Sequence, residues 1–215
     1  MNTNTRPSGT LPTLLVLIVA LAAGLGLWAG QKFFSRPAGA PQVDSMRLLD
    51  ARRVLPEFSL AAGDGGVLDA QALRGRWTLV FLGFTHCPDV CPTTLASLAR
   101  AEKQWASLPV ARRPRILFVS VDPERDTSET LRKYAAYFSP DILTATSDIP
   151  SLNRFAASLS MVFAKAPQDD GGYTIDHTSW VAVLDPQANL AGFIRPPLDP
   201  ERIAADMRTL VEHAP

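Results

Sequence analysis

The feature that most constrains this chain is an uncharged, strongly apolar run near its amino terminus, residues 11–30. Arg6 is the last charged residue before the run and Lys32 is the first after it. A helix of this length measures about 30 Å, which matches the hydrocarbon thickness of a bilayer. Trp28 lies near one end, where interfacial aromatic side chains collect. The run therefore predicts a single transmembrane helix, and the remaining chain must build its own core without it.

A cleaved signal peptide is the alternative interpretation of the same run. Residues 38–40 read Ala-Gly-Ala and resemble a cleavage site, but they lie well past the run, which is itself long for a signal core. We therefore favour a retained anchor at residues 11–30, preceded by a short tail of residues 1–10. The positive charges that flank the run do not decide its orientation. In either case we expect the following residues to leave the cytoplasm.

The rest of the chain is interpreted as a tether and one folded domain. Residues 31–52 are mixed in character and contain Pro37 and Pro41, so they predict a linker, and residues 53–215 predict the domain. Lysine plus arginine equals aspartate plus glutamate at 21 each, and no basic patch stands out, which argues against a nucleic-acid partner. A content of 47% hydrophobic and 20% charged residues excludes a disordered chain.

Two continuous apolar segments, residues 77–83 and 115–121, predict strands that are buried on both faces. Apolar residues at helical spacing follow each of them. For the second helix we expect Asp126 to be the N-cap and Glu129 to complete the capping box. Further elements are expected as strands near residue 143 and at 161–165, 180–184 and 190–194, and as helices at 152–159 and behind Asp199-Pro200.

This order predicts an α/β sandwich with a central mixed sheet. Right-handed crossovers make the first two predicted strands parallel neighbours. Ligand sites in such sheets lie outside the carboxyl ends of the strands. The segment that follows residue 83 is therefore the place to look for chemistry.

That segment, residues 83–92 and hereafter the cysteine loop, holds the two cysteines of the chain, Cys87 and Cys91. They are too few and too close together for a disulfide scaffold. Pro88 and Pro92 restrict the loop and favour a helix start beside the thiols, where the helix dipole is expected to lower a thiol pKa. Two thiolates one turn apart can bind the same ion. A disulfide between them is a second possibility, because the i, i+4 spacing allows it.

His177 is the best candidate for a third ligand, because it precedes a predicted strand and could stand beside the cysteine loop. An imidazole with two thiolates suits copper, although zinc also accepts these ligands. We assign a structural role to His86 and a helix-dipole role to His213. Asp122 is interpreted as a turn residue. Asp89 is either a turn residue or a group that hydrogen-bonds a metal ligand.

Three segments occur in an order that resembles the Sco/SenC family. They read FTHCPDVCPTTL, VSVDPERDT and DHTSWVAVLDP, and the similarity covers roughly residues 56–210. The resemblance implies a thioredoxin-like fold, with metal ligands at Cys87, Cys91 and His177. It implies binding of Cu(I) and Cu(II), and a role in assembling the dinuclear copper site of cytochrome c oxidase subunit II. One departure is Gln187-Ala-Asn189, where a glycine is expected.

The resemblance also implies a cellular setting. No Arg- and Ser-rich transit peptide precedes the anchor, so we favour a bacterial inner-membrane protein whose soluble domain lies in the periplasm. Its expected partner is cytochrome c oxidase subunit II, with other periplasmic copper carriers or thiol reductants as further partners.

We predict a metallochaperone rather than an enzyme, and two other readings of the cysteines stay open. A thiol–disulfide reductase acting on the target's cysteines, or a redox or copper sensor, is the main alternative. Two features argue against a reductase. Thioredoxin-type enzymes place two residues between their cysteines, whereas this chain has three. They also have a cis-proline beside the active site, just before the strand that is predicted here at Trp180, and this chain has no proline there. A peroxiredoxin would need threonine three residues before its reactive cysteine, where Phe84 and Pro88 stand instead.

Overall fold

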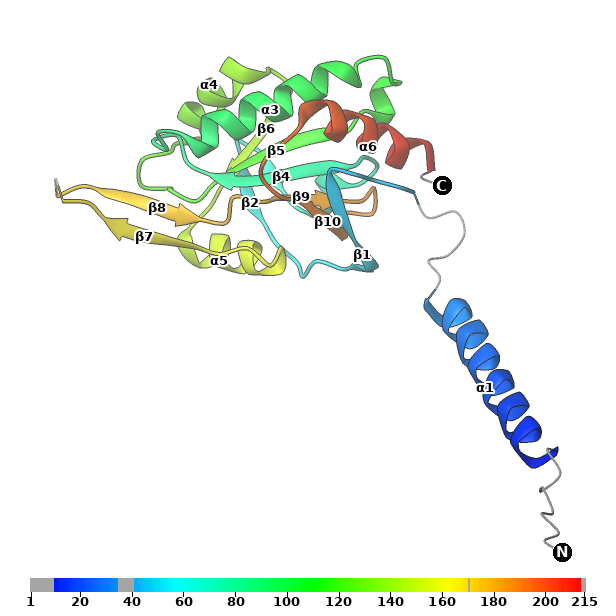
Figure 1. Ribbon diagram of the computed structural model, residues 1–215. Helices are drawn as coiled ribbons and strands as arrows, with labels where there is room; N and C mark the ends of the chain where they lie inside the picture. The colour runs from blue at the N-terminus through cyan, green and yellow to red at the C-terminus, as the bar shows by residue number, and fades with distance from the viewer. Residues whose placement is uncertain (1–9, 35–40, 170, 214–215) are drawn as a thin grey trace, which may run out of the picture. The chain divides into compact units, whose positions relative to one another are not determined.

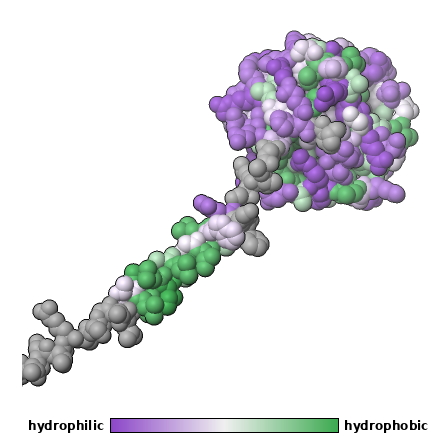
Figure 2. Space-filling view, turned by 90° about the vertical axis from the view of Figure 1, so that its right-hand side faces the viewer, coloured by the Kyte–Doolittle hydropathy of each residue, from purple (hydrophilic) through white to green (hydrophobic). Residues whose placement is uncertain are grey.

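The computed structural model describes residues 10–34, 41–169 and 171–213. The chain divides into two compact units, Met1–Ala40 and Pro41–Pro215. The first unit contains helix α1 (Thr10–Phe34), of which Thr13–Gln31 is long and apolar enough to cross a membrane. Figure 2 shows its apolar surface, which is also what a signal sequence would present. The predicted cleavage motif at residues 38–40 and all but the last residue of the predicted tail lie outside the described residues.

The second unit is built on an eight-stranded mixed sheet, within the part of the chain that the structure describes, in the order β1-β10-β9-β4-β5-β6-β2-β3. Strands β4, β5 and β6 are parallel, and β9 runs antiparallel to β4. The mixed sheet and the parallel first pair are therefore confirmed. The strands are β1 (Met46–Arg53), β2 (Leu60–Ala62), β3 (Val67–Leu68), β4 (Thr78–Gly83), β5 (Arg115–Ser120), β6 (Leu143–Thr146), β9 (Val181–Leu184) and β10 (Leu190–Ile194).

Helices cover both faces of the sheet (Figure 1). Right-handed crossovers from β4 through β5 to β6 place α3 and α4 on one face, and α6 packs beside α3, while α5 lies on the other face. Every residue of β4 is buried, which agrees with its continuous apolar run after Thr78. The helices are α2 (Ala70–Leu73), α3 (Val90–Gln104), α4 (Ser128–Phe138), α5 (Ile149–Ser158) and α6 (Pro200–His213), with a 3₁₀ turn at Val110–Arg112.

The predicted start of α6 is confirmed, whereas the predicted N-cap of α4 is wrong. Asp199 precedes α6 and accepts hydrogen bonds from the backbone N–H groups of Glu201 and Arg202, both at 3.1 Å. Asp126, however, does not cap α4. Thr127 is the N-cap, and its hydroxyl accepts from the Thr130 N–H at 3.2 Å. The prediction for Asp126 was wrong because its carboxylate is buried in other contacts, which form part of the site below.

Strand β1 falls mostly within residues 31–52, for which we predicted a tether. It pairs with β10, and Asp206 on α6 accepts the backbone N–H groups of Asp44 and Ser45 just before it. The strand reads MRLLDARR and only its first residue is buried. An edge strand has one face and one edge in solvent, so it can be rich in charged residues. Such a sequence is therefore hard to recognise as a strand.

A second, two-stranded antiparallel sheet consists of β7 (Phe163–Pro167) and β8 (Tyr173–His177), paired from Phe163↔His177 to Pro167↔Tyr173. Figure 1 shows this hairpin extending beyond the main sheet. We predicted a strand at 161–165, which overlaps β7, but no strand at β8. His177 is the last residue of β8, so it reaches the site from the hairpin.

Candidate metal centre

The cysteine loop connects the buried end of β4 to the first turn of α3. Cys87 is half-buried in the loop, and Cys91, in the first turn of α3, has no exposed surface. Both cysteines are free thiols, and the Cys91 N–H donates to the Cys87 sulfur at 3.4 Å. The loop that leads into α3 therefore folds back so that the Cys87 sulfur lies beside the first turn of the helix.

Gly83, the last residue of β4, allows the sulfur of Cys91 to approach the sheet. A Cβ at this position would lie 2.8 Å from Cys91 Sγ and 2.9 Å from a ring carbon of Phe118. Any side chain here would collide with both neighbours, since both are buried. Sequence analysis missed this role. A glycine at the end of a buried strand, just before two cysteines, was the available signal.

His177 completes the group. One of its ring nitrogens and the two sulfurs lie within 4.8 Å of one another, and Nε2 is 3.4 Å from Cys91 Sγ. Nδ1 lies 3.2 Å from the carbonyl oxygen of Thr178, which can only accept, so Nδ1 carries the proton. The Nε2 lone pair therefore faces the sulfur and accepts its S–H. A metal ion bound here would take the place of that proton.

The rings of Phe81 and Phe84 hold the imidazole in this orientation. Both meet His177 edge-on, with centroids 5.7 Å and 6.1 Å away and interplanar angles of 72° and 89°. Phe81 lies on β4 and Phe84 follows it, so the strand that leads into the cysteine loop also supports the histidine. The sequence reasoning that placed His177 near the loop is consistent with this arrangement, but it identified neither phenylalanine as a neighbour.

Burial sets the protonation of the group. It raises the pKa of the Cys91 thiol above its usual range, and the nearby Cys87 and Asp126 act in the same direction. The expectation that the helix dipole lowers the thiol pKa is therefore wrong for Cys91, because desolvation is the larger effect. Burial also lowers the pKa of His177, so its imidazole stays neutral. A cation bound here would compensate for the buried thiolate that it requires.

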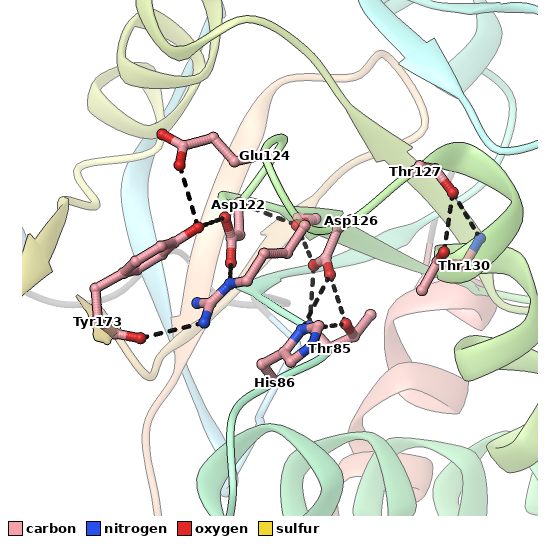
Figure 3. A network of polar contacts seen from close by, with 10 residues as sticks. Thr85, His86, Asp122, Glu124, Asp126, Thr127, Thr130 and Tyr173 are labelled. Atoms are coloured by element: carbon pink, nitrogen blue, oxygen red, sulfur yellow. Dashed lines mark hydrogen bonds and ion pairs between the residues drawn. The ribbon is translucent and has the colours of Figure 1, made fainter. Parts of the chain in front are cut away.

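Asp126 fixes the start of the cysteine loop by hydrogen bonds to Thr85. The carboxylate is 1% exposed and accepts hydrogen bonds from the Thr85 N–H at 2.9 Å, the Thr85 hydroxyl at 2.5 Å and the Ser120 hydroxyl at 2.6 Å. Figure 3 shows Asp126 facing Thr85 and His86. Because Thr85 precedes Cys87 by two residues, Asp126 ties the loop to the end of β5.

The remaining candidates lie outside the three-ligand group. The Nδ1 of His86 is 3.1 Å from the Thr85 hydroxyl and 3.8 Å from Asp126, and its side chain is otherwise exposed. His213 donates from Nδ1 to the Thr209 carbonyl at 2.8 Å in the last turn of α6. Asp89 stands at the N-cap of α3 without a side-chain cap bond. Within the described residues, the one group that could hold a metal ion is Cys87, Cys91 and His177.

Comparison with known proteins gives one consistent result. Residues 47–212 match the model of the SCO1/SenC family. The chain is 30% identical over 206 residues to the mitochondrial SCO2 homolog of Bos taurus, which covers 94% of this chain and 77% of that protein.

Solved structures agree with this match. ScoI of Bradyrhizobium japonicum with copper bound is 32% identical, with a TM-score of 0.65 over 72% of this chain and 98% of that chain. Apo Sco1 of Thermus thermophilus is also 32% identical, with a TM-score of 0.69 over 80% of this chain and 99% of that chain. The predicted thioredoxin-like fold is thereby confirmed.

Proposed function

Because this chain belongs to the SCO1/SenC family, we propose that it is a membrane-anchored copper metallochaperone that binds the ion with Cys87, Cys91 and His177. The observation that carries the proposal is the convergence of their donor atoms within 4.8 Å of one another. Two residues come from the cysteine loop and one from a strand 86 positions away from Cys91.

The donor set fits copper in both of its common oxidation states. Thiolates are soft ligands that favour Cu(I), and imidazole suits Cu(II) as well. Three protein ligands leave a coordination position open, so a thiolate from a partner can enter before a ligand of this chain leaves. The half-exposed Cys87 is the sulfur that an incoming protein can reach. The arrangement thus supports transfer of the ion better than permanent storage.

We place the site in a bacterial periplasm, with α1 as the single-pass anchor in the inner membrane and the dinuclear copper site of cytochrome c oxidase subunit II as the destination. Family membership and the apolar Thr13–Gln31 segment support this placement. Both thiols must be reduced to bind the ion, so reductants of the same compartment are expected partners, together with other periplasmic copper carriers.

A thiol–disulfide reductase that acts on the cysteines of the target site is the second candidate. The pairing of a half-exposed thiol with a buried one favours it, because the first could attack a partner disulfide and the second could resolve it. The raised pKa of Cys91 opposes this chemistry in the metal-free protein, since resolution requires a thiolate.

The test is an anaerobic copper titration of the reduced full-length protein in detergent micelles. We expect one ion per chain, no binding when both cysteines are replaced by serine, and weaker binding for His177→Ala. His213→Ala is the control, because it removes an exposed imidazole on α6. Copper-loaded protein is then mixed with metal-free subunit II. Stoichiometric copper retained by the double cysteine variant would refute the proposal, and turnover of a subunit II disulfide without metal transfer would favour the reductase.

A further inference from the structure

The hairpin that carries His177 is a separate two-stranded sheet, so its position depends on contacts with the rest of the domain. Isolated two-stranded hairpins are marginally stable in water. The hairpin contacts the apolar core through Ile175, which is buried, and through the partly buried Phe163 and Tyr173, while the other side chains of β7 are mostly exposed. The question is therefore which residues fix the imidazole at the sulfurs.

One answer lies in the turn between β5 and α4, residues 122–126, hereafter the 122–126 turn. The Arg125 guanidinium lies 3.8 Å above the Tyr173 ring, and its Nη1 donates to the Tyr173 carbonyl at 3.2 Å. The Tyr173 hydroxyl donates to Asp122 Oδ1 at 2.9 Å (Figure 3). Tyr173 begins β8 and His177 ends it, four residues later, so both side chains point to the same face.

Arg125 is itself firmly held. Its Nε donates to Asp122 Oδ2 at 2.5 Å, and Asp122 is only 2% exposed. The guanidinium is held through Nε, through Nη1 and through its face against the Tyr173 ring, which together fix its orientation. The same guanidinium lies 5.7 Å from the ring centre of Phe84, the residue that packs edge-on against His177. Arg125 thus contacts Phe84, which packs against the imidazole, and Tyr173, which begins the strand that ends at His177.

The 122–126 turn also contacts the other strand of the hairpin and the cysteine loop. Lys165 on β7 pairs with Glu124 at 2.8 Å and lies 3.7 Å from the centre of the Tyr173 ring. At the opposite end of the turn, Asp126 holds Thr85. The 122–126 turn therefore contacts both the hairpin that carries His177 and the loop that carries the cysteines, without supplying a ligand.

We infer that Arg125 is a positioning residue for His177, and that the 122–126 turn sets the distance between the imidazole and the two sulfurs. This inference rests on the proposed copper site. It assigns Arg125 no contact with the ion. Its effect on copper passes through His177 alone, and that restriction makes the inference testable.

The experiment compares Cu(II)-loaded full-length protein with its Arg125→Ala variant. We expect the thiolate-to-copper charge-transfer absorption to persist, and the nitrogen hyperfine coupling from His177 to weaken or disappear. The Cu(II) affinity should fall by about 10- to 100-fold, as for loss of other groups that orient a ligand. In a His177→Ala background, Arg125→Ala should change the affinity by less than about twofold, since residues that act through one another are non-additive.

Three further proteins separate positioning from general damage. Arg202→Ala is the matched control, because Arg202 also pairs with an aspartate three residues away, at 3.2 Å, and this pair is exposed at the start of α6. It should leave affinity and coupling unchanged. Arg125→Lys keeps the charge but loses the fork, so it should recover only part of the coupling. Tyr173→Phe removes only a hydroxyl and should lower the coupling in the same direction, which keeps the test open if Arg125→Ala does not fold.

A measurement on the metal-free protein completes the test. Amide hydrogen exchange across residues 173–177 should accelerate in Arg125→Ala, while exchange in β4 should stay at the wild-type rate. Wild-type nitrogen coupling in Arg125→Ala, or an equal loss of affinity with and without His177, would overturn the inference. If the wild-type protein binds no copper, the proposed function is wrong. The exchange measurement needs no metal, so it still tests whether Arg125 holds the hairpin.

Discussion

The cysteine loop and the β7–β8 hairpin supply ligands to the same site but are held by different means. Cys91 is part of the core, directly behind a strand whose residues are all buried. His177 ends a strand with one buried residue, in a sheet that does not pair with the main one. The Cys91 sulfur is therefore fixed by packing of the core, whereas the imidazole is fixed by contacts between side chains, among them the rings of Phe81 and Phe84. A carrier gains from this division, since it can release one ligand without disturbing its core.

The largest effect is expected where the core half is anchored, at Asp126. Asp126→Ala leaves the Thr85 N–H and the hydroxyls of Thr85 and Ser120 without their acceptor in a buried place. We expect the free energy of unfolding to fall by about 3 kcal/mol or more. Urea unfolding measures this loss.

Asp148→Ala is the matched control for that measurement. Asp148 also accepts a backbone N–H and a hydroxyl, both from Ser151, but at the exposed N-cap of α5. Its loss should cost about 1 kcal/mol. A loss for Asp126→Ala no greater than that of the control would show that the cysteine loop is not anchored by this carboxylate.

Gly83→Ala tests the same half by overpacking. The new methyl group would meet Cys91 Sγ and the Phe118 ring below 3 Å, so we expect a loss of about 1–3 kcal/mol in unfolding free energy and weaker copper binding. Gly66→Ala is the control, because its Cβ would meet only an exposed Asp64 side chain, at 3.2 Å. Copper affinity equal to that of the wild type in Gly83→Ala would mean that the Cys91 sulfur is not confined as the packing suggests.

His177→Ala addresses the hairpin half, and its two effects should separate. Copper binding should weaken by more than about tenfold, because a direct ligand is lost. The unfolding free energy should change by no more than about 1 kcal/mol, because the imidazole is only half-buried and its contacts are with ring edges. Competition with a copper indicator and urea unfolding measure the two quantities. A stability loss larger than that of Gly83→Ala would contradict the division into a core half and a peripheral half.

The sequence reveals the core half far better than the peripheral half. Continuous apolar residues predicted β4 and β5, and two cysteines in a proline-bounded loop indicated the sulfurs, since local pattern and burial agree there. Strand β8 was missed because it is short and half-exposed, so its residues carry no clear period. Asp126 was misassigned because a cap and a buried acceptor look alike in sequence. Its partner Thr85 is 41 positions away, and only folding brings them together.

The smallest effect is expected outside both halves, at Ala188 in the turn between β9 and β10. Ala188 has φ of 63°, a left-handed conformation that costs an L-residue about 1–2 kcal/mol and glycine nothing. The expected glycine is thus explained by the backbone. Asp185 holds the turn by accepting the N–H groups of Gln187 and Asn189 at 2.9 Å, so alanine is tolerated.

Ala188→Gly should raise the unfolding free energy by up to about 1 kcal/mol, because relief of the backbone is partly offset by the greater freedom of glycine in the unfolded chain. Ala182→Gly, in the buried strand β9, should instead lower it by about 0.5–1 kcal/mol. Copper affinity should stay at the wild-type value in Ala188→Gly. If the affinity rises together with stability, copper binding follows the stability of the whole domain, and the division of the site into a core half and a peripheral half is wrong.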